Sequence, residues 1–209
     1  MRHERKYRIE NVSHEAVLQD MMSIAGAFDN AYPDRWVNSV YLDSTDFNAL
    51  NENLSGISQR SKYRMRWYGD LNGTLHTPIL EEKVKHNMLG YKNLLQLEST
   101  KLNQDSLRKA LDLKQIKDLG LIPTVTIRYL RTYLESYDHR VRITIDRNLQ
   151  YFGINNYQLD PYGKQDDAII LEVKYDEEDE EDIDYILQDI RYRLTKNSKF
   201  VSAVMNYWS

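Results

Sequence analysis

Residues 60–67 read Arg-Ser-Lys-Tyr-Arg-Met-Arg-Trp, and this stretch decides how the chain folds. Successive side chains of a β-strand point to opposite faces of a sheet, so residues two apart share a face. One face of this strand then carries four cations, namely Arg60, Lys62, Arg64 and Arg66. The other face carries Tyr63, Met65 and Trp67. The pattern therefore predicts a strand over residues 60–69 with one charged face and one face suited to a hydrophobic core.

Four other segments show the same division between a charged and an apolar face. Their charged or polar positions are Glu4, Lys6 and Arg8 in 2–10; Glu81, Lys83 and Lys85 in 78–86; Arg140, Arg142, Thr144 and Asp146 in 139–149; and Glu172 and Lys174 in 168–175. Residues 36–43, 90–98 and 123–135 also have strand composition, which makes eight predicted strands. So many strands with few helices between them favour a mostly antiparallel sheet or barrel over alternating βαβ units.

Helical periodicity is confined to a few segments. One predicted helix begins after Ser13, a suitable N-cap. The others cover 47–54, 104–119, 183–194 and 200–208. The first of them has apolar residues at three- and four-residue steps from Val17 to Phe28. These helices are few enough to pack against one side of the predicted strands.

The charged faces have two explanations that the sequence leaves open. An open sheet or a sandwich could simply turn them to water. However, the faces are nearly all charge, and four cations in a line on one strand repel one another unless acids or a polyanion lie near them. We therefore expect an α+β fold: a single domain over residues 1–209 in which eight antiparallel strands form a tunnel with a charged interior, with helices packed outside.

The overall composition hides a basic surplus. The net charge is −4, but eight of the 32 carboxylates lie between residues 176 and 184. The remaining 24 carboxylates face 28 cations, so a positive cleft is compatible with the acidic whole. The acidic run itself is explained by the start of a predicted helix, where carboxylates complement the helix dipole.

Several classes of protein are disfavoured by what the sequence lacks. Zero cysteines exclude disulfides and cysteine-based zinc sites, and the five histidines are scattered without ligand spacing. There is no apolar run of about 18 residues, and the N-terminus, Met1-Arg2-His3-Glu4-Arg5-Lys6, is charged and lacks the apolar segment of a signal peptide. We therefore expect neither membrane insertion nor a secretory signal. We expect a cytoplasmic protein.

Lines of Lys and Arg with a few carboxylates suit a polyphosphate ligand. Arg forks pair with phosphate oxygens, Lys supplies charge, and carboxylates hold a divalent cation. Phosphoryl transfer depends mostly on positioning and charge neutralisation, so it needs no nucleophile motif, and the sequence shows none. Nucleic acid is the competing polyanion, but Tyr63 and Trp67 lie on the face away from the cations, and the interleaved glutamates would repel its backbone. We expect no nucleic-acid partner.

Eight short motifs, in order along nearly the whole chain, carry a resemblance to a known family. They are Arg5-Lys6-Tyr7, Ser39-Val40-Tyr41-Leu42-Asp43, Tyr63-Arg64-Met65-Arg66-Trp67-Tyr68, Leu80-Glu81-Glu82-Lys83, Arg128-Tyr129-Leu130-Arg131-Thr132, Val141-Arg142-Ile143-Thr144-Ile145-Asp146, Leu171-Glu172-Val173-Lys174 and Ser198-Lys199-Phe200. The chain resembles the catalytic domain of the vacuolar transporter chaperone (VTC) polyphosphate polymerases, in the triphosphate tunnel metalloenzyme superfamily. Each motif is weak alone, and their order makes the signal specific.

The resemblance implies roles for individual residues. Catalytic, phosphate-contacting roles are implied for Arg64, Arg66, Lys83, Arg131, Arg142 and Lys174. Substrate-binding roles are implied for Lys6, Lys92, Lys196 and Lys199, to which we add Lys62 because it shares the face of Arg64. Glu172 matches the metal-binding glutamate, which would hold Mn²⁺ or Mg²⁺, and Glu81 and Glu4 are further metal or water partners. Asp146 is as well explained by a structural ion pair as by a functional role.

The resemblance also implies an activity, with rivals that the sequence leaves open. We expect an ATP-dependent polyphosphate polymerase. Hydrolases of the superfamily carry Glu-x-Glu-x-Lys on the first strand, whereas Arg2 replaces the first Glu here, which favours the polymerase branch. A triphosphatase or short-chain polyphosphatase using the same residues, and a non-catalytic polyphosphate-binding module, remain the alternatives. The eukaryotic regulatory domain and membrane helices have no counterpart in this sequence, which leaves a separate membrane partner open.

Overall fold

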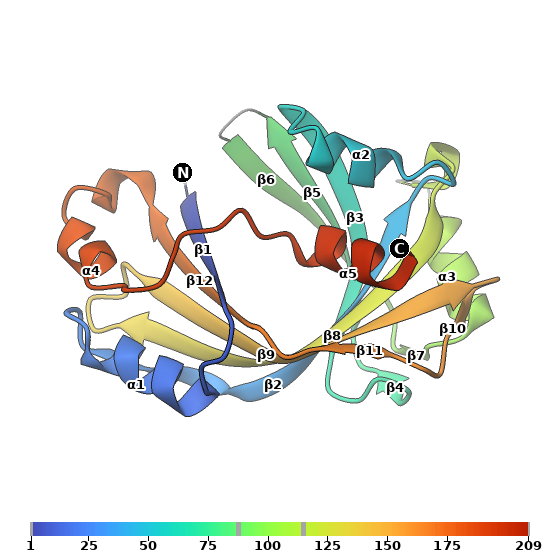
Figure 1. The fold of residues 1–209 in the computed structure, drawn as a ribbon. Helices are drawn as coiled ribbons and strands as arrows, with labels where there is room; N and C mark the ends of the chain where they lie inside the picture. Colours follow the sequence, from blue (N-terminus) through green and yellow to red (C-terminus); the bar gives the residue numbers. More distant parts are fainter. Residues whose placement is uncertain (1, 87–88, 114–115, 209) are drawn as a thin grey trace. The chain divides into compact units, whose positions relative to one another are not determined.

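The computed structural model describes residues 2–86, 89–113 and 116–208. Its main sheet follows an eight-strand path, with two short strands attached at its side. The order along the path is β1 (Arg2–Ile9), β12 (Ile169–Asp176), β9 (Arg142–Asn155), β8 (Ile122–Ser136), β2 (Phe28–Asp43), β3 (Gln59–Tyr68), β5 (Ile79–His86) and β6 (Leu89–Gln96) (Figure 1). In the described residues this order is an open path from β1 to β6. The predicted α+β fold built on eight mostly antiparallel strands is confirmed.

The remaining elements are short. Strands β10 (Gln158–Leu159) and β11 (Lys164–Asp166) pair with β9, and β4 (Thr74–Leu75) pairs with β7 (Thr100–Lys101). The helices are α1 (His14–Ser23), α2 (Asn48–Leu54), α3 (Gln104–Leu111), α4 (Asp184–Gln188) and α5 (Lys199–Trp208), with single 3₁₀ turns at Lys117–Leu119 and Glu177–Asp179. In the part of the chain that the structure describes, no helix is long and apolar enough to cross a bilayer.

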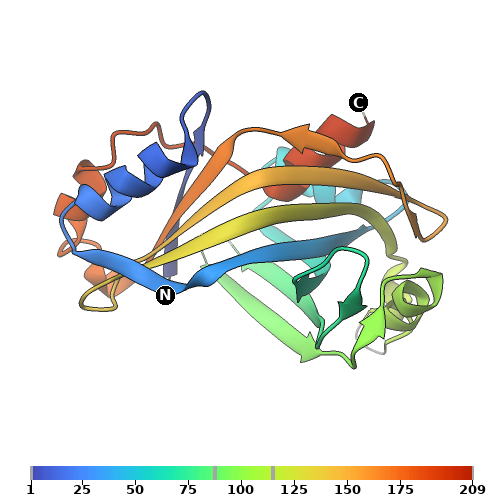
Figure 2. The ribbon, with the colours of Figure 1, turned by 90° about the horizontal axis from the view of Figure 1, so that it is seen from below.

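Contacts divide the chain into two compact units. The first comprises Met1–Arg35, Tyr129–Leu149 and Asp166–Asn197, and the second comprises Trp36–Arg128, Gln150–Gln165 and Ser198–Ser209. Strands β2, β8 and β9, the long strands of Figure 2, each contribute residues to both units. That the two units form a single domain stays a prediction.

The first unit has its core on one face of β1, β12 and β9. Val17 and Met21 of α1 pack there against residues such as Ile143 and Val173, together with the segment from Ile183 to Ile190. Because the strand side chains alternate, Lys6, Glu172 and Arg142 lie on the opposite face. The predicted division into an apolar, helix-covered face and a charged face is therefore confirmed in this unit.

The second unit repeats this arrangement with different helices. Val40, Met65, Trp67 and Leu80 form a core with α3 through Leu107. Antiparallel pairing places Tyr41 opposite Arg64 on β2 and β3, and Arg64 opposite Glu81 on β3 and β5. The cations of segment 60–67 thus share a face with Tyr41 and Glu81, and Trp67 lies on the opposite face.

Helix positions were predicted better than helix lengths. Ser13 does cap α1, accepting a hydrogen bond from the backbone N–H of Ala16. However, the helix ends at Ser23 because Ile24 takes an extended conformation, with φ −72° and ψ 161°. Gly26 and Ala27 then take positive φ angles of 114° and 46°, and Phe28 begins β2.

The predicted helices 104–119 and 183–194 are wrong in extent. The first stops at Leu111, and the second is only the short α4, Asp184–Gln188. Ile190 is buried all the same, because the chain that follows α4 packs into the core of the first unit. A spacing of buried residues that resembles a helix therefore arose here from tertiary packing.

We predict that Ile143→Ala and Arg142→Ala, neighbours on one strand, differ sharply in their effect on stability. Ile143 is fully buried, so its truncation should lower the free energy of unfolding by about 2–4 kcal/mol through lost burial and a cavity. The Arg142 side chain is 57% exposed, and its loss should cost about 0.5 kcal/mol. Urea unfolding monitored by circular dichroism measures both; equal costs would contradict the assignment of faces.

Candidate phosphate-binding site

Three cations surround one buried carboxylate in the second unit. Arg64 binds Glu81 at two points, with Nη2 to Oε1 at 2.7 Å and Nε to Oε2 at 3.1 Å. Lys92 Nζ lies 3.0 Å from Glu81 Oε1, and Arg66 Nη1 lies 3.6 Å from Oε2. Burial alone would raise the pKa of Glu81, which is 3% exposed, but Arg64 and Arg66 lower it well below its usual range. Glu81 is therefore a permanent anion that allows these cations to lie side by side.

The same cluster holds more hydrogen-bond donors than its single carboxylate satisfies. Arg66 Nε and Ser39 Oγ are buried and have no hydrogen-bond partner among the described residues. The two residues are paired across β2 and β3, so both belong to one spot on the charged face. Buried donors without partners are costly, and an anion's oxygens would remove that cost. The cluster thus has the charge and the donors of an anion site.

Further cations form a row beside this cluster. Strand register places Lys62 opposite Lys83, and Lys83 opposite Lys92, across β3, β5 and β6. Burial lowers the pKa of Lys92, and Glu81 opposes that shift. The row gives the charged face of the second unit a run of ammonium groups suited to successive phosphates.

Tyr41 links Arg64 to the start of α5. Arg64 Nη1 donates to Tyr41 Oη at 2.9 Å, and the Tyr41 ring stacks on Phe200 at 5.1 Å. Burial would raise the pKa of Tyr41, but Arg64 and Arg66 bring it below its usual value. Lys62 Nζ donates to Ser198 Oγ at 3.2 Å and lies 5.7 Å from the Phe200 ring centre. The beginning of α5 is therefore attached to the cationic face of the same unit.

In the first unit, two carboxylates and two lysines alternate across β1 and β12. Glu4 is paired with Lys174, and Lys6 with Glu172. Lys174 Nζ lies 3.0 Å from Glu172 and 3.5 Å from Glu4, while Lys6 Nζ lies 3.2 Å from Glu4 and 3.8 Å from Glu172. Unlike the Glu81 cluster, this group has equal numbers of cations and anions.

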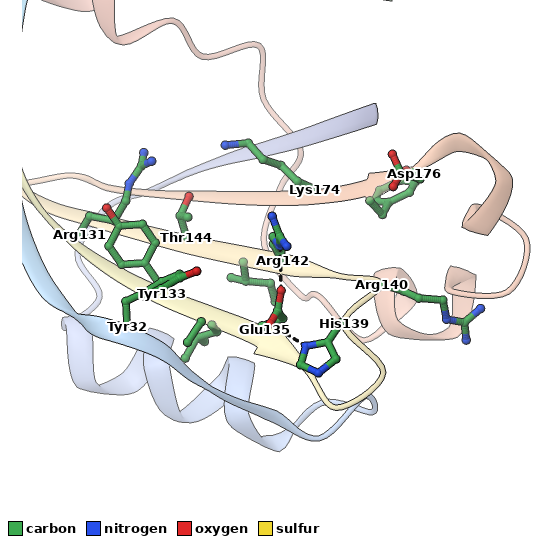
Figure 3. Close-up of a pocket in the computed structure, with 14 residues that line it drawn as sticks. Tyr32, Arg131, Tyr133, Glu135, His139, Arg140, Arg142, Thr144, Lys174 and Asp176 are labelled. Carbon is green, nitrogen blue, oxygen red and sulfur yellow. Dashed lines mark hydrogen bonds and ion pairs between the residues drawn. The ribbon is translucent and has the colours of Figure 1, made fainter. Parts of the chain in front are cut away.

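Two arginines of the first unit are each held by a carboxylate. Arg131 is buried and bound at two points by Asp146, with Nη2 to Oδ2 at 2.7 Å. Burial opposes its charge, yet Asp146 raises the pKa of Arg131 above its usual value. Arg142 Nε donates to Glu135 at 2.8 Å, and Glu135 also contacts His139 Nδ1 at 2.7 Å (Figure 3). Asp146 thus takes the ion-pair role that was one of its two predicted roles.

Glu4 and Glu172 could together hold a divalent cation. Among the described residues no group of three or more histidine, aspartate and glutamate side chains is arranged to hold a metal ion. Yet the two carboxylates share both lysines, and the buried Thr144 Oγ1, on the residue paired with Glu172, has no partner in the described part of the chain. Oxygen donors of this kind suit Mg²⁺ or Mn²⁺, which typically takes one or two carboxylates and completes its shell with water and substrate phosphates. The residues fit such an ion.

The predicted site residues thus fall into two groups, one in each unit. The second unit brings together Arg64, Arg66, Glu81 and Lys92, with Lys62 and Lys83 on paired strand positions. Lys199 begins α5 in the same unit. The first unit brings together Glu4, Lys6, Glu172 and Lys174, with Arg131 and Arg142 on adjacent strands. Lys196 is exposed in the first unit. The sequence analysis gave no roles to Tyr41, Ser39 and Glu135. Side-chain alternation could have indicated Tyr41 and Ser39, once Arg64 and Arg66 were placed on the neighbouring strand. Glu135 could be found only from the register of β8 and β9.

A family model decides the identity of the chain: the model for the VTC domain matches residues 1–207. The chain belongs to the VTC domain family. This confirms the resemblance on which the site residues were chosen, while the role of each residue stays a prediction.

Solved structures share the fold at low sequence identity. A putative adenylate cyclase from Bacillus halodurans has a TM-score of 0.57 and 16% identity, over 99% of this chain and 96% of that one. A putative adenylyl cyclase from Hippeastrum, described as having a dominant triphosphatase activity, has a TM-score of 0.56 and 14% identity over the same shares. One from Vibrio parahaemolyticus has a TM-score of 0.55 and 16% identity over 95% of both chains. This chain thus shares the fold of these proteins. Comparison with curated proteins finds no match.

We predict that Glu81→Gln destabilises the protein by about 3 kcal/mol, because it leaves three neighbouring cations without their shared counter-ion. A carboxylate with a depressed folded pKa stabilises fully above its unfolded pKa of about 4.3, and this stabilisation is lost as pH falls through the folded pKa. In urea unfolding, the difference in the free energy of unfolding between wild type and the variant should therefore be constant above about pH 5 and become smaller in acid.

Glu82→Gln is the matched control for that substitution. Glu82 lies on the same strand and opposite face, where it accepts hydrogen bonds from Tyr63 Oη at 2.6 Å and Asn93 at 2.8 Å. Its loss should cost about 1 kcal/mol. If the two variants were equally stable, the special role of Glu81 would be refuted.

Proposed function

We propose that this protein is a metal-dependent polyphosphate polymerase that transfers the γ-phosphate of ATP to a growing polyphosphate chain. The observation that carries the proposal is the cluster in which Arg64, Arg66 and Lys92 outnumber Glu81, with the donor Arg66 Nε buried and unpartnered among the described residues. Among enzymes that act on phosphates, membership of the VTC domain family favours a polymerase.

Phosphate oxygens would complete the cluster around Glu81. Arg64 and Arg66 offer planar forks of N–H donors, and Lys62, Lys83 and Lys92 offer ammonium charge along one row. A linear polyphosphate carries a negative charge on each successive phosphate, so a row of cations matches it over its length. The proposal therefore assigns these residues to gripping the substrate and product chain.

Residues of the first unit would support the transferring phosphoryl group. Glu172 and Glu4 would hold Mg²⁺ or Mn²⁺, with Lys6 and Lys174 neutralising adjacent oxygens. When bound, the metal ion would neutralise charge on the phosphate oxygens and orient them for in-line displacement. Arg131 and Arg142 add guanidinium groups on β8 and β9, where Asp146 and Glu135 fix their orientation.

The proposed step is a single displacement with balanced charge. An oxygen of the terminal phosphate on the acceptor chain attacks the γ-phosphorus of ATP and forms the new P–O–P bond. The bond from the γ-phosphorus to the β,γ-bridging oxygen breaks, and its electron pair leaves on ADP. No side-chain nucleophile takes part, since the protein contributes position and charge.

Hydrolysis is the second candidate. The Hippeastrum protein that shares this fold is described as a dominant triphosphatase, and the same residues would serve water as the acceptor. A non-catalytic polyphosphate-binding module would have little use for the paired carboxylates Glu4 and Glu172, which favours the enzymes.

The products formed from ATP in the presence of Mn²⁺ or Mg²⁺ test the proposal. The polymerase predicts a ladder of long phosphate chains on a stained gel and one ADP for each phosphate added. Free phosphate without chains would replace the proposal by the triphosphatase. Bound ATP without either product would favour the binding module.

We predict that Glu172→Gln lowers turnover by about 100-fold or more, because even the loss of a group that only orients a metal ligand typically costs about 10–100-fold. Binding of Mn²⁺, followed by electron paramagnetic resonance with triphosphate present, should weaken in parallel. The exposed Glu15 on α1 provides the control, and Glu15→Gln should leave both unchanged. Undiminished turnover in a folded Glu172→Gln protein would exclude the metal role.

A further inference from the structure

A cavity of about 270 Å³ opens on the charged face of the first unit. Its lining contains cations that the family resemblance implicates in phosphate contact, Arg131, Arg142 and Lys174. It also contains two tyrosines that no proposed role yet explains, Tyr32 on β2 and Tyr133 on β8. A ligand that fills this cavity therefore meets both aromatic and cationic side chains.

The two tyrosines form a small aromatic wall. Their ring centres lie 5.7 Å apart at an interplanar angle of 85°, an edge-to-face arrangement. The Arg35 guanidinium lies over both rings, 5.3 Å from the Tyr32 centre and 4.8 Å from the Tyr133 centre. Tyr32 nevertheless stays 58% exposed, although it lines the cavity. The wall is thus held by a neighbouring cation and still offers aromatic surface to a ligand.

The cations lie beside this wall on the adjacent strands. Figure 3 shows Tyr133 close to Arg131 and Thr144, with Arg142 and Lys174 following along β9 and β12. Glu135 fixes Arg142, and Glu172 fixes Lys174, so both cations have defined positions. Thr144 Oγ1, which belongs to a residue of the lining, is buried without a partner among the described residues. The cavity combines stacking surface, charge and a buried hydroxyl that can form a hydrogen bond.

The size of the cavity limits its occupant. Sites for whole drug-sized ligands span about 300–1,000 Å³, so this one fits a fragment such as a base or a nucleoside. A bare phosphate chain has no group that benefits from aromatic surface. A nucleobase does, since stacking on an aromatic side chain is worth about 1–3 kcal/mol per base.

We propose that this cavity is the subsite for the base of a nucleoside triphosphate, which stacks on Tyr32 and Tyr133 while Arg142 and Lys174 hold the phosphates next to it. This inference rests on the proposed function and adds to it the means of distinguishing a nucleotide from inorganic polyphosphate. Tyr32 and Tyr133 then set how well ATP binds as phosphate donor, without contributing to the grip on the polymer.

Calorimetric binding of ATP and of inorganic tripolyphosphate to wild type and Tyr32→Ala tests the proposal. The variant should bind ATP about tenfold more weakly, as loss of about 1.4 kcal/mol of stacking implies, and tripolyphosphate within about twofold of wild type. Tyr32→Phe retains the ring and should bind ATP like wild type. The binding measurement needs no turnover, so its result is independent of the proposed reaction. The proposed reaction is tested separately, by whether phosphate chains form from ATP.

Tyr137→Ala provides the matched control, because Tyr137 is 84% exposed on the β8–β9 turn and lies outside the lining. It should bind both ligands like wild type. Tyr133→Leu gives an independent reading from the second ring and should weaken ATP binding selectively as well. Equal losses for ATP and tripolyphosphate in Tyr32→Ala, or an ATP affinity unchanged in both ring variants, would overturn the base subsite.

Discussion

The buried ion pair between Arg64 and Glu81 is the interaction on which the rest of the charged face depends. Strand alternation forces Arg60, Lys62, Arg64 and Arg66 to share one face, and like charges so close repel one another. Glu81, placed opposite Arg64 by register, offsets part of this repulsion at a position that is nearly inaccessible to solvent. One carboxylate does not neutralise its three cations, so the fold keeps a positive charge that suits an anionic ligand.

The two charged groups differ in their balance of charge, and the proposed function gives them different chemistry. Around Glu81 the cations are in excess, as a grip on phosphates requires. Around Glu172 the numbers are equal, since Glu4 and Glu172 alternate with Lys6 and Lys174. Paired carboxylates would weaken a pure anion site, and they are expected where a divalent cation is bound together with phosphate. Charge balance therefore supports a phosphoryl-transfer role more strongly than the total number of lysines and arginines does.

Strand parity was the part of the sequence that predicted most. It predicted the core face of Met65 and Trp67 and the charged face of Arg64 and Arg66. Side chains alternate along a strand whichever strands lie beside it, so this prediction needed no knowledge of the pairing. It could not give pairs such as Arg131 with Asp146 or Arg142 with Glu135, which depend on the β8–β9 register. The predicted helix 183–194 was wrong because Ile190 is buried by a non-helical segment, and the spacing of apolar residues does not distinguish the two.

The most direct test of the central claim is the thermal unfolding of the protein with tripolyphosphate and with sulfate at equal ionic strength. A ligand at about 100 times its dissociation constant stabilises the folded state by about 2.7 kcal/mol. For a chain of this size that raises Tm by roughly 5–10 °C. The account predicts such a rise with tripolyphosphate, little change with sulfate, and a reduced rise in Arg64→Ala. Equal shifts with both anions, or none with either, would contradict a site built for a chain of phosphates.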